Sequence, residues 1–188
     1  MKIISCFFIL FSTGLFAQNG IENYQVDVNK YLLKMDSIKK SSIGKEFYDF
    51  KAKTLEGNSA FKRDLLGKIT IVDIWFENCA PCLVELEKLS ELYKKFKDIS
   101  DFKFLSFTID SPDVAIKAVK KYNISYEVCP ISREVANNMN FNMGFPTKII
   151  INREGKIVFF KIGGSTNSGI VEKDIKEIED IIRKLIYQ

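Results

Sequence analysis

The pair Cys79 and Cys82 stands where an apolar strand pattern gives way to a helix pattern. The segment from Ile69 to Phe76 is apolar except for Thr70 and Asp73, and Cys79-Ala80-Pro81-Cys82 follows it closely. Two cysteines at the start of a helix that follows a buried strand are typical of a dithiol/disulfide redox centre. Free N–H groups and the positive end of the helix dipole favour the thiolate there, so its pKa can fall from about 8.5 to roughly 3.5–7.5. The junction therefore predicts a redox-active cysteine pair.

The residues after the motif predict an amphipathic helix. Apolar side chains recur at steps of three and four, at Leu83, Leu86, Leu89, Tyr93 and Phe96. Pro81 falls in the first turn, where its missing N–H costs little. This spacing places Cys79 at an exposed helix tip as the nucleophile. Cys82 then lies one turn along, more buried and close enough to bond to Cys79 as the resolving cysteine.

A CxxC pair can also be half of a structural zinc site, which needs two further ligands. The chain has no histidine, and its other cysteines are Cys6 and Cys129. Carboxylate ligands stay open but nothing in the pattern supports them. We therefore expect a redox pair, no metal and no cofactor beyond the Cys79–Cys82 disulfide.

The N-terminus has the pattern of a secretory signal peptide. Lys2 precedes an apolar segment that ends at the small residue Ala17, and cleavage there would leave residues 18–188. The alternative is an uncleaved membrane anchor, although the segment is short for a span of about 20 residues. Cys6 comes too early to be a lipidation site. We expect an exported protein, periplasmic or otherwise extracytoplasmic, that contacts the membrane only if this segment is retained.

Composition excludes several other classes of protein. The formal charge of +4 comes from lysines dispersed among acidic residues, which is typical of solvated faces and not of a nucleic-acid surface. Export permits disulfides, yet the mature chain would hold three cysteines, too few for a disulfide scaffold. The hydrophobic content of 46% is enough for one ordinary core.

The remaining pattern predicts an α/β fold. Residues 18–43 form a short helix or tether, and the redox domain covers 44–188. Strands are expected at 47–55, 69–76, 102–108, 147–152 and 156–162, with a helical turn or short strand at 61–66. Helices are expected from Pro112, over 133–140 and near the C-terminus. Strands alternating with helices, followed by a hairpin and a closing helix, predict a central mixed sheet covered on both faces.

On these residues the chain resembles the thioredoxin superfamily, specifically its exported TlpA/ResA-like branch. The resemblance rests on Gly67-Lys68, the strand through Phe76, the CxxC motif, Glu85, Gly144-Phe145-Pro146-Thr147 and Gly155. It implies a thioredoxin-like fold with helices on both faces of the sheet. It also implies thiol–disulfide exchange with cysteines of partner proteins. An upstream electron-donor protein would supply the electrons. The branch further suggests a reductant, in a family that includes cytochrome c maturation proteins.

The resemblance assigns roles to three further residues. It makes the Phe145–Pro146 bond cis and the Phe145 backbone a pairing site for a substrate strand; the alternative is a proline that merely opens a strand. Asp73 is a carboxylate inside an apolar strand, so its pKa should rise. The resemblance makes it a proton relay behind Cys82; the alternative is a structural carboxylate satisfied by a lysine.

Other residues near the motif allow plainer interpretations. Trp75 packs near the helix, while Ala80 and Pro81 shape the motif. Glu85 either tunes the site or belongs to a solvated helix face. Cys129 is expected to be a small buried residue.

Two rival functions are compatible with parts of this pattern. A peroxiredoxin-like peroxidase would need a threonine where Phe76 stands, and a peroxide-consumption assay would identify it. A non-catalytic binding module with the same fold would not need Cys79, Cys82 and Pro146, and thiol titration would identify it.

Overall fold

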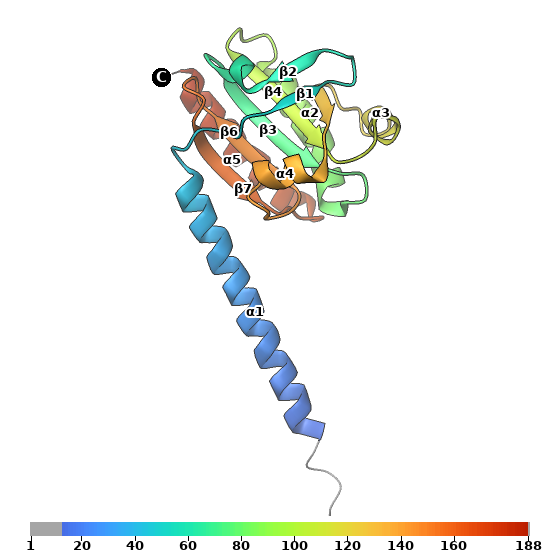
Figure 1. The fold of residues 1–188 in the computed structure, drawn as a ribbon, viewed down its shortest axis with the longest axis vertical. Coiled ribbons are helices and arrows are strands. Elements are labelled where there is room, and N and C mark those ends of the chain that lie inside the picture. The colour runs from blue at the N-terminus through green and yellow to red at the C-terminus, as the bar shows by residue number, and fades with distance from the viewer. Residues whose placement is uncertain (1–12, 188) are drawn as a thin grey trace, which may run out of the picture. The chain divides into compact units, whose positions relative to one another are not determined.

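The computed structural model describes residues 13–187, with side chains described from Asp27 onward (Figure 1). The elements are α1 (Thr13–Ser42), β1 (Lys51–Lys53), β2 (Ser59–Phe61), the 3-10 helix η1 (Lys62–Leu65), β3 (Ile69–Trp75), α2 (Ala80–Phe96), β4 (Phe102–Thr108), α3 (Pro112–Lys121), β5 (Glu127–Pro130), α4 (Arg133–Met139), β6 (Thr147–Ile151), β7 (Ile157–Ile162) and α5 (Ser168–Ile186).

Helix α1 forms a unit of its own as far as Ile38, and the chain from Lys39 onward forms a second, compact unit. The expected cleavage position after Ala17 falls within α1, while most of the expected signal segment lies outside the described residues. The boundary of the mature chain therefore stays a prediction. Within the described residues, no helix is long and apolar enough to cross a membrane.

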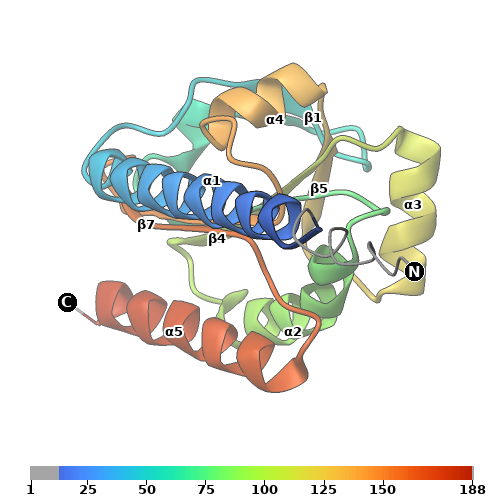
Figure 2. The same cartoon turned by 90° about the horizontal axis from the view of Figure 1, so that it is seen from below.

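The compact unit is built on a five-stranded mixed sheet of order β5-β4-β3-β6-β7. Strand β3 is central and buried along its whole length, parallel to β4 and antiparallel to β6. Helices α2 and α5 lie on one face of the sheet, and α4 lies with the β1–β2 hairpin on the other (Figure 2). The expected mixed sheet with helices on both faces is confirmed.

Both faces of the sheet are packed with apolar side chains. On the α2 face, Trp75 and Phe104 meet Leu86 of α2 and Ile178 of α5 in one buried cluster. On the opposite face an aromatic group connects the segment before β1 to the sheet. The ring of Phe50 lies 5.1 Å from that of Phe107 and 6.0 Å from that of Phe47. Burial on both faces explains why β3 is a nearly continuous apolar run.

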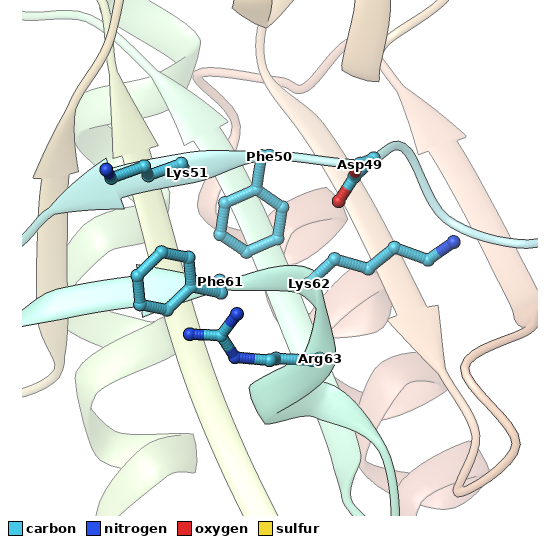
Figure 3. A pocket seen from close by; sticks show the side chains of 6 residues that line it. All are labelled: Asp49, Phe50, Lys51, Phe61, Lys62 and Arg63. Atoms are coloured by element: carbon cyan, nitrogen blue, oxygen red, sulfur yellow. The ribbon is translucent and has the colours of Figure 1, made fainter.

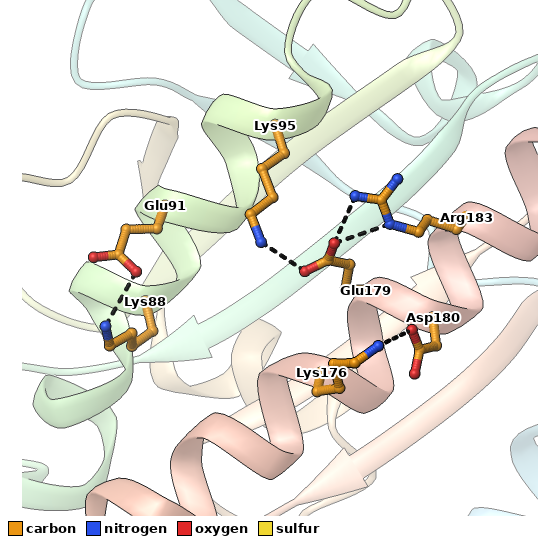
Figure 4. A network of polar contacts seen from close by, with 7 residues as sticks. All are labelled: Lys88, Glu91, Lys95, Lys176, Glu179, Asp180 and Arg183. Atoms are coloured by element: carbon orange, nitrogen blue, oxygen red, sulfur yellow. Dashed lines mark hydrogen bonds and ion pairs between the residues drawn. The ribbon is translucent and has the colours of Figure 1, made fainter.

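Helices α2 and α5 are also joined at the surface by charged side chains (Figure 4). Lys95 of α2 lies 2.7 Å from Glu179 of α5, and Arg183 holds the same carboxylate at 2.7 Å. Lys176 and Asp180 form a further pair along α5. Exposed pairs of this kind contribute about 0–1 kcal/mol each, so the apolar cluster beneath them is the main source of stability.

The helical turn expected as one possibility for residues 61–66 is observed as η1, which directly follows β2. Two elements differ from the sequence-based expectations. The strand expected over 47–55 is limited to β1, because the residues before it serve as an aromatic link to the sheet. Strand β5 was not expected. It has only four residues, and Cys129-Pro130 within it does not continue the alternation of apolar and polar residues by which a longer strand is recognised.

Candidate active site around the Cys79–Cys82 disulfide

Cys79 and Cys82 form a disulfide at the start of α2, with their Cα atoms 5.2 Å apart. Cys79 is the N-cap residue, and its carbonyl accepts a hydrogen bond from the Leu83 N–H at 3.1 Å. Pro81 lies in the first turn, as its sequence position indicated, with Ala80 before it. A sulfur at this cap lies beside unpaired helix N–H groups, which stabilise a thiolate once the disulfide is reduced.

The exposed tip expected for Cys79 is not observed. Cys79 is 6% exposed and Cys82 is 1% exposed. Both residues belong to the buried cluster that contains Trp75. Cys79 is still the more accessible of the two, so the order of accessibility agrees with its expected role as the nucleophile.

The segment between β3 and α2 is held in place by the neighbouring strand end. The Glu77 N–H donates to Asp110 Oδ2 at 2.7 Å, and the Thr108 hydroxyl donates to the same oxygen at 2.9 Å. Because β3 and β4 are parallel, their carboxyl ends meet at this edge of the sheet. Asp110 therefore fixes the path of the chain just before the cysteines.

The loop before β6 lies next to this segment. The Phe145–Pro146 peptide bond is cis, the geometry that the resemblance implied; the substrate-binding role of these residues stays a prediction. The Phe145 ring packs edge-on against Phe76 at 5.1 Å, which places the loop beside the chain leading to Cys79. The Arg133 guanidinium lies 6.0 Å from the Phe76 ring centre and 5.9 Å from that of Phe145.

Hydrogen bonds fix the shape of this loop. The Gly144 carbonyl accepts from Asn140 Nδ2 at 2.9 Å and from the Thr147 hydroxyl at 2.7 Å. Gly144 has φ of 101°, a conformation that side chains rarely adopt. The Pro146 carbonyl accepts from the Gly163 N–H at 2.8 Å, so the loop is also tied to the end of β7.

Asp73 is 1% exposed and lies on the same face of the sheet as Trp75, which packs in one cluster with both cysteines. Burial raises the pKa of Asp73 to about 7, a shift that Lys148 and a hydrogen bond from Ser106 reduce and Glu85 increases. The Ser106 hydroxyl in turn accepts from Trp75 Nε1 at 2.7 Å. Asp73 Oδ2 has no hydrogen-bond partner among the described residues. A carboxyl group with a pKa near neutrality can accept and return a proton at physiological pH.

Glu85 is the site residue whose burial the sequence left open. The interpretation as part of a solvated helix face is wrong: Glu85 is 1% exposed and forms an ion pair with Lys148 of β6, which is equally buried. Burial raises the pKa of Glu85, and Lys148 opposes that rise. Sequence reasoning missed Lys148, although a lysine between Thr147 and Ile149-Ile150-Ile151 is as unusual as an aspartate within β3.

Cys129 and Tyr126 do not join this chemistry. Cys129 is buried and free, and burial raises the pKa of its thiol to about 12, so it stays protonated. Burial likewise raises the pKa of Tyr126 well above its usual value, which keeps its hydroxyl neutral. The interpretation of Cys129 as a small buried residue is confirmed.

A surface hollow of about 320 Å³ lies elsewhere, between β1, β2 and η1 (Figure 3). Its lining is Asp49, Phe50, Lys51, Phe61, Lys62 and Arg63. Lys62 forms an ion pair with Glu46, with 2.6 Å between Nζ and Oε2. The Arg63 guanidinium lies 4.0 Å from the centre of the Phe61 ring. Its lining contains none of the residues around the disulfide. In the part of the chain that the structure describes, no cluster of acidic or cysteine side chains is suited to a metal ion.

The contact between Glu85, Pro146 and Gly164 yields a testable prediction. A methyl group at Gly164 would lie 2.5 Å from Glu85 Oε1 and 2.9 Å from Pro146 Cγ. Gly164→Ala should therefore displace both residues, destabilise the fold by about 1–3 kcal/mol and slow disulfide exchange. Urea denaturation and an exchange assay measure the two effects. Gly169→Ala is the matched control, because its nearest neighbour would be 3.4 Å away. Equal stability and rate in the two variants would show that this contact is not important.

Comparisons with known proteins show which family the chain belongs to. The model of the AhpC/TSA family matches residues 43–160. The thiol-disulfide oxidoreductase ResA of Bacillus cereus (strain ZK / E33L) is 32% identical over 129 residues, which cover 68% of this chain and 73% of that protein. The thioredoxin-like protein YneN of Bacillus subtilis (strain 168) is 28% identical over 133 residues, covering 69% and 77%.

Solved structures show the same fold. The thioredoxin domain of a thiol-disulfide oxidoreductase from Bacteroides vulgatus has a TM-score of 0.58 and 27% identity, covering 71% of this chain and 98% of that one. A putative thiol:disulfide interchange protein DsbE from Chlorobium tepidum has a TM-score of 0.67 and 20% identity, covering 77% and 97%. Since the family model matches more than half of the sequence and the ResA relative shares 32% identity over 68% of it, the chain belongs to the AhpC/TSA family of thioredoxin-like proteins.

Proposed function

We propose that this protein reduces disulfides of exported partner proteins by exchange with its Cys79–Cys82 pair. It is an enzyme, a thiol-disulfide oxidoreductase. The observation that carries the proposal is the disulfide at the N-terminus of α2, with the Phe145–Pro146 loop packed beside the chain that leads to it. The ResA and DsbE names of its relatives support the same reaction class.

The reaction has two exchange steps. In the first, the Cys79 thiolate attacks one sulfur of a partner disulfide, forms a mixed disulfide and releases the other partner sulfur as a thiolate. In the second, the Cys82 thiol loses its proton and attacks the Cys79 sulfur. The Cys79–Cys82 bond forms, and the second partner sulfur leaves as a thiolate. Two electrons thus pass from the protein to its partner, and a donor dithiol must return them.

Three other residues support these steps. The backbone of Phe145, turned by the bond to Pro146, offers an edge to which an extended partner segment can pair. That pairing would hold the partner cysteine near Cys79. Asp73 takes the proton of Cys82 in the second step, since its pKa of about 7 lies near the working pH. The disulfide itself is the redox group, so the reaction needs no metal or organic cofactor.

The reducing direction rests on the resemblance to the TlpA/ResA-like branch, as does a role in cytochrome c maturation. Comparable centres span about −270 to −120 mV, and for this two-electron couple 30 mV corresponds to about 1.4 kcal/mol. Modest stabilisation of the Cys79 thiolate therefore decides between reductant and oxidant. A potential at the reducing end of that range would support the assigned direction.

The test is a redox titration combined with insulin reduction. The protein is equilibrated in dithiothreitol buffers, and the fluorescence of its single tryptophan, Trp75, reports the state of the neighbouring disulfide. Insulin reduction should depend on Cys79 and Cys82 and should survive Cys129→Ala, the matched control. Peroxide consumption without insulin reduction would instead support a peroxidase and contradict the proposal.

Export adds a prediction about the mature N-terminus. The signal pattern ending at Ala17 predicts that the mature protein begins at Gln18 and lies outside the cytoplasm. Mass spectrometry of the extracytoplasmic fraction should give the mass of residues 18–188. Recovery of the intact chain from the cytoplasm would contradict both parts of this prediction, whereas an intact chain in the membrane fraction would favour the anchor.

A further inference from the structure

A row of polar side chains crosses the otherwise apolar face of the sheet beneath α2 and α5. Strand register places Ser106, Asp73, Lys148 and Lys161 opposite one another on β4, β3, β6 and β7. Directly paired residues point to the same side of a sheet. The Lys148 ammonium donates a hydrogen bond to the Glu85 carboxylate of α2. Lys161 Nζ likewise donates to Asp174 Oδ1 of α5 at 2.5 Å. The row thus continues from buried Ser106 on β4 to partly exposed Lys161 on β7.

The inner part of this row adjoins the reacting groups. Glu85 lies one turn beyond Cys82 on α2, and its carboxylate is close enough to Pro146 that a methyl group on Gly164 would touch both residues. Asp73 lies two residues before Trp75, which packs in the cluster with both cysteines. Lys148, two residues after Pro146, stands between the two carboxyl groups.

The charges of these three residues cannot all be neutralised by pairing. Two buried carboxyl groups face one buried cation, and an unpaired buried charge is costly. Lys148 is hydrogen-bonded to Glu85 Oε2, while Glu85 Oε1 and Asp73 Oδ2 have no partner among the described residues. Glu85 therefore has a directly bound cation, and Asp73 is the carboxyl group whose charge is least compensated.

We propose that Lys148 is a positioning residue for the exchange reaction: by binding the Glu85 carboxylate, it leaves Asp73 as the group that takes the proton of Cys82. This rests on the function proposed above. In the second step the proton passes from the Cys82 thiol to the Asp73 carboxylate. The resulting Cys82 thiolate attacks the Cys79 sulfur, and the partner leaves as a thiolate that is protonated by solvent.

Every element packed against Asp73 contributes to its electrostatic environment. Lys148 of β6 favours its charge, Glu85 of α2 opposes it, and Ser106 of β4 stabilises it by a hydrogen bond. Tyr126, which precedes β5, stays neutral, and the outer group consists of Lys161 with the carboxylates of Asp174 and Glu177. Removing Lys148 should therefore raise the pH at which Asp73 ionises, whereas removing the charge of Glu85 should lower it.

The experiment compares Lys148→Met with Glu85→Gln. Each reduced variant is mixed with a disulfide substrate, and Trp75 fluorescence follows the second step from pH 5.5 to 9. We expect the midpoint of the pH–rate profile, near 7 in the unmodified protein, to move up by about one pH unit or more in Lys148→Met, a loss of at least about fivefold at pH 7. The midpoint should move down in Glu85→Gln, and Lys148→Arg should restore much of the original profile.

The matched control is Lys95→Met, which removes one lysine charge from the surface pair with Glu179 (Figure 4). Its pH midpoint should equal that of the unmodified protein. If Lys148→Met is too unstable to study, the double variant Lys148→Met/Glu85→Gln removes both members of the pair and leaves no unpaired partner charge. Its midpoint should lie between those of the single variants.

A purely structural role for Lys148 makes a different prediction. Lys148→Met would then lower the denaturation midpoint but leave the pH–rate midpoint unchanged, and that result would overturn the proposal. The pH titration of the Asp73 carboxyl carbon by NMR provides a readout that does not require activity. If the unmodified protein fails to reduce disulfides, the proposed function is wrong. An Asp73 titration that does not respond to Lys148→Met refutes the inference independently.

Discussion

Replacing Cys79 by serine should reduce disulfide exchange by at least about a thousandfold, because a serine hydroxyl is not ionised at neutral pH and cannot attack a disulfide. Replacing Cys82 by serine should instead permit the first step and block the second. Partner proteins should then accumulate as mixed disulfides on Cys79. Insulin reduction measures the first effect, and non-reducing gel electrophoresis after acid quenching measures the second.

The control for both variants is Cys129→Ala, which removes the third cysteine of the compact unit. The Cys129 thiol is buried with a pKa raised to about 12, so its loss should not alter exchange. Mixed disulfides that form on Cys82 in the Cys79→Ser variant would reverse the assigned roles. The difference in burial between the two cysteines makes that outcome unexpected.

Asp73→Asn should change both stability and the pH dependence of exchange. The pKa of Asp73 is raised from 3.8 to about 7, so its contribution to stability is fully present below pH 4 and is lost as the pH rises through 7. Over that interval the loss is on the order of 4 kcal/mol. The asparagine variant lacks this dependence, so its stability should exceed that of the unmodified protein most clearly at pH 8.

The same variant should slow the second exchange step across neutral pH, because Cys82 loses its proton acceptor. Urea denaturation at pH 5 and pH 8 and stopped-flow fluorescence of Trp75 provide the two measurements. Asp180→Asn is the matched control, since Asp180 is paired with Lys176 on the surface of α5. If Asp73→Asn resolves mixed disulfides at the normal rate from pH 6 to pH 9, Asp73 is a structural residue only.

Much of the fold and part of the site could be predicted from the sequence, because they depend on local patterns. The strand before Cys79, the helix after Cys82 and the burial of Asp73 each follow from the order of apolar and polar residues over one or two elements. The cis bond at Pro146 was different: an isolated proline is usually trans, and only the resemblance to a known family implied otherwise.

The Glu85–Lys148 pair could not be predicted in the same way. A glutamate in an amphipathic helix and a lysine near the start of a strand each belong by default to solvated faces. Their burial depends on the pairing of β6 with β3 and the position of α2 above them, and both are contacts between distant segments. Strand β5 was missed for a related reason, since a four-residue strand is defined by its neighbour β4 more than by its own sequence.

The polar row across the sheet also has a consequence for how the chain assembles. If β6 were displaced along β3 by one residue, Lys148 would point to the opposite face, among the rings of Phe107 and Phe160. Glu85 would then remain buried without its cation, which would cost several kcal/mol. The free-energy cost of a misaligned sheet is thus larger than the cost of the lost apolar contacts alone. The residues that set the charge behind Cys82 therefore also help to select the correct strand alignment during folding.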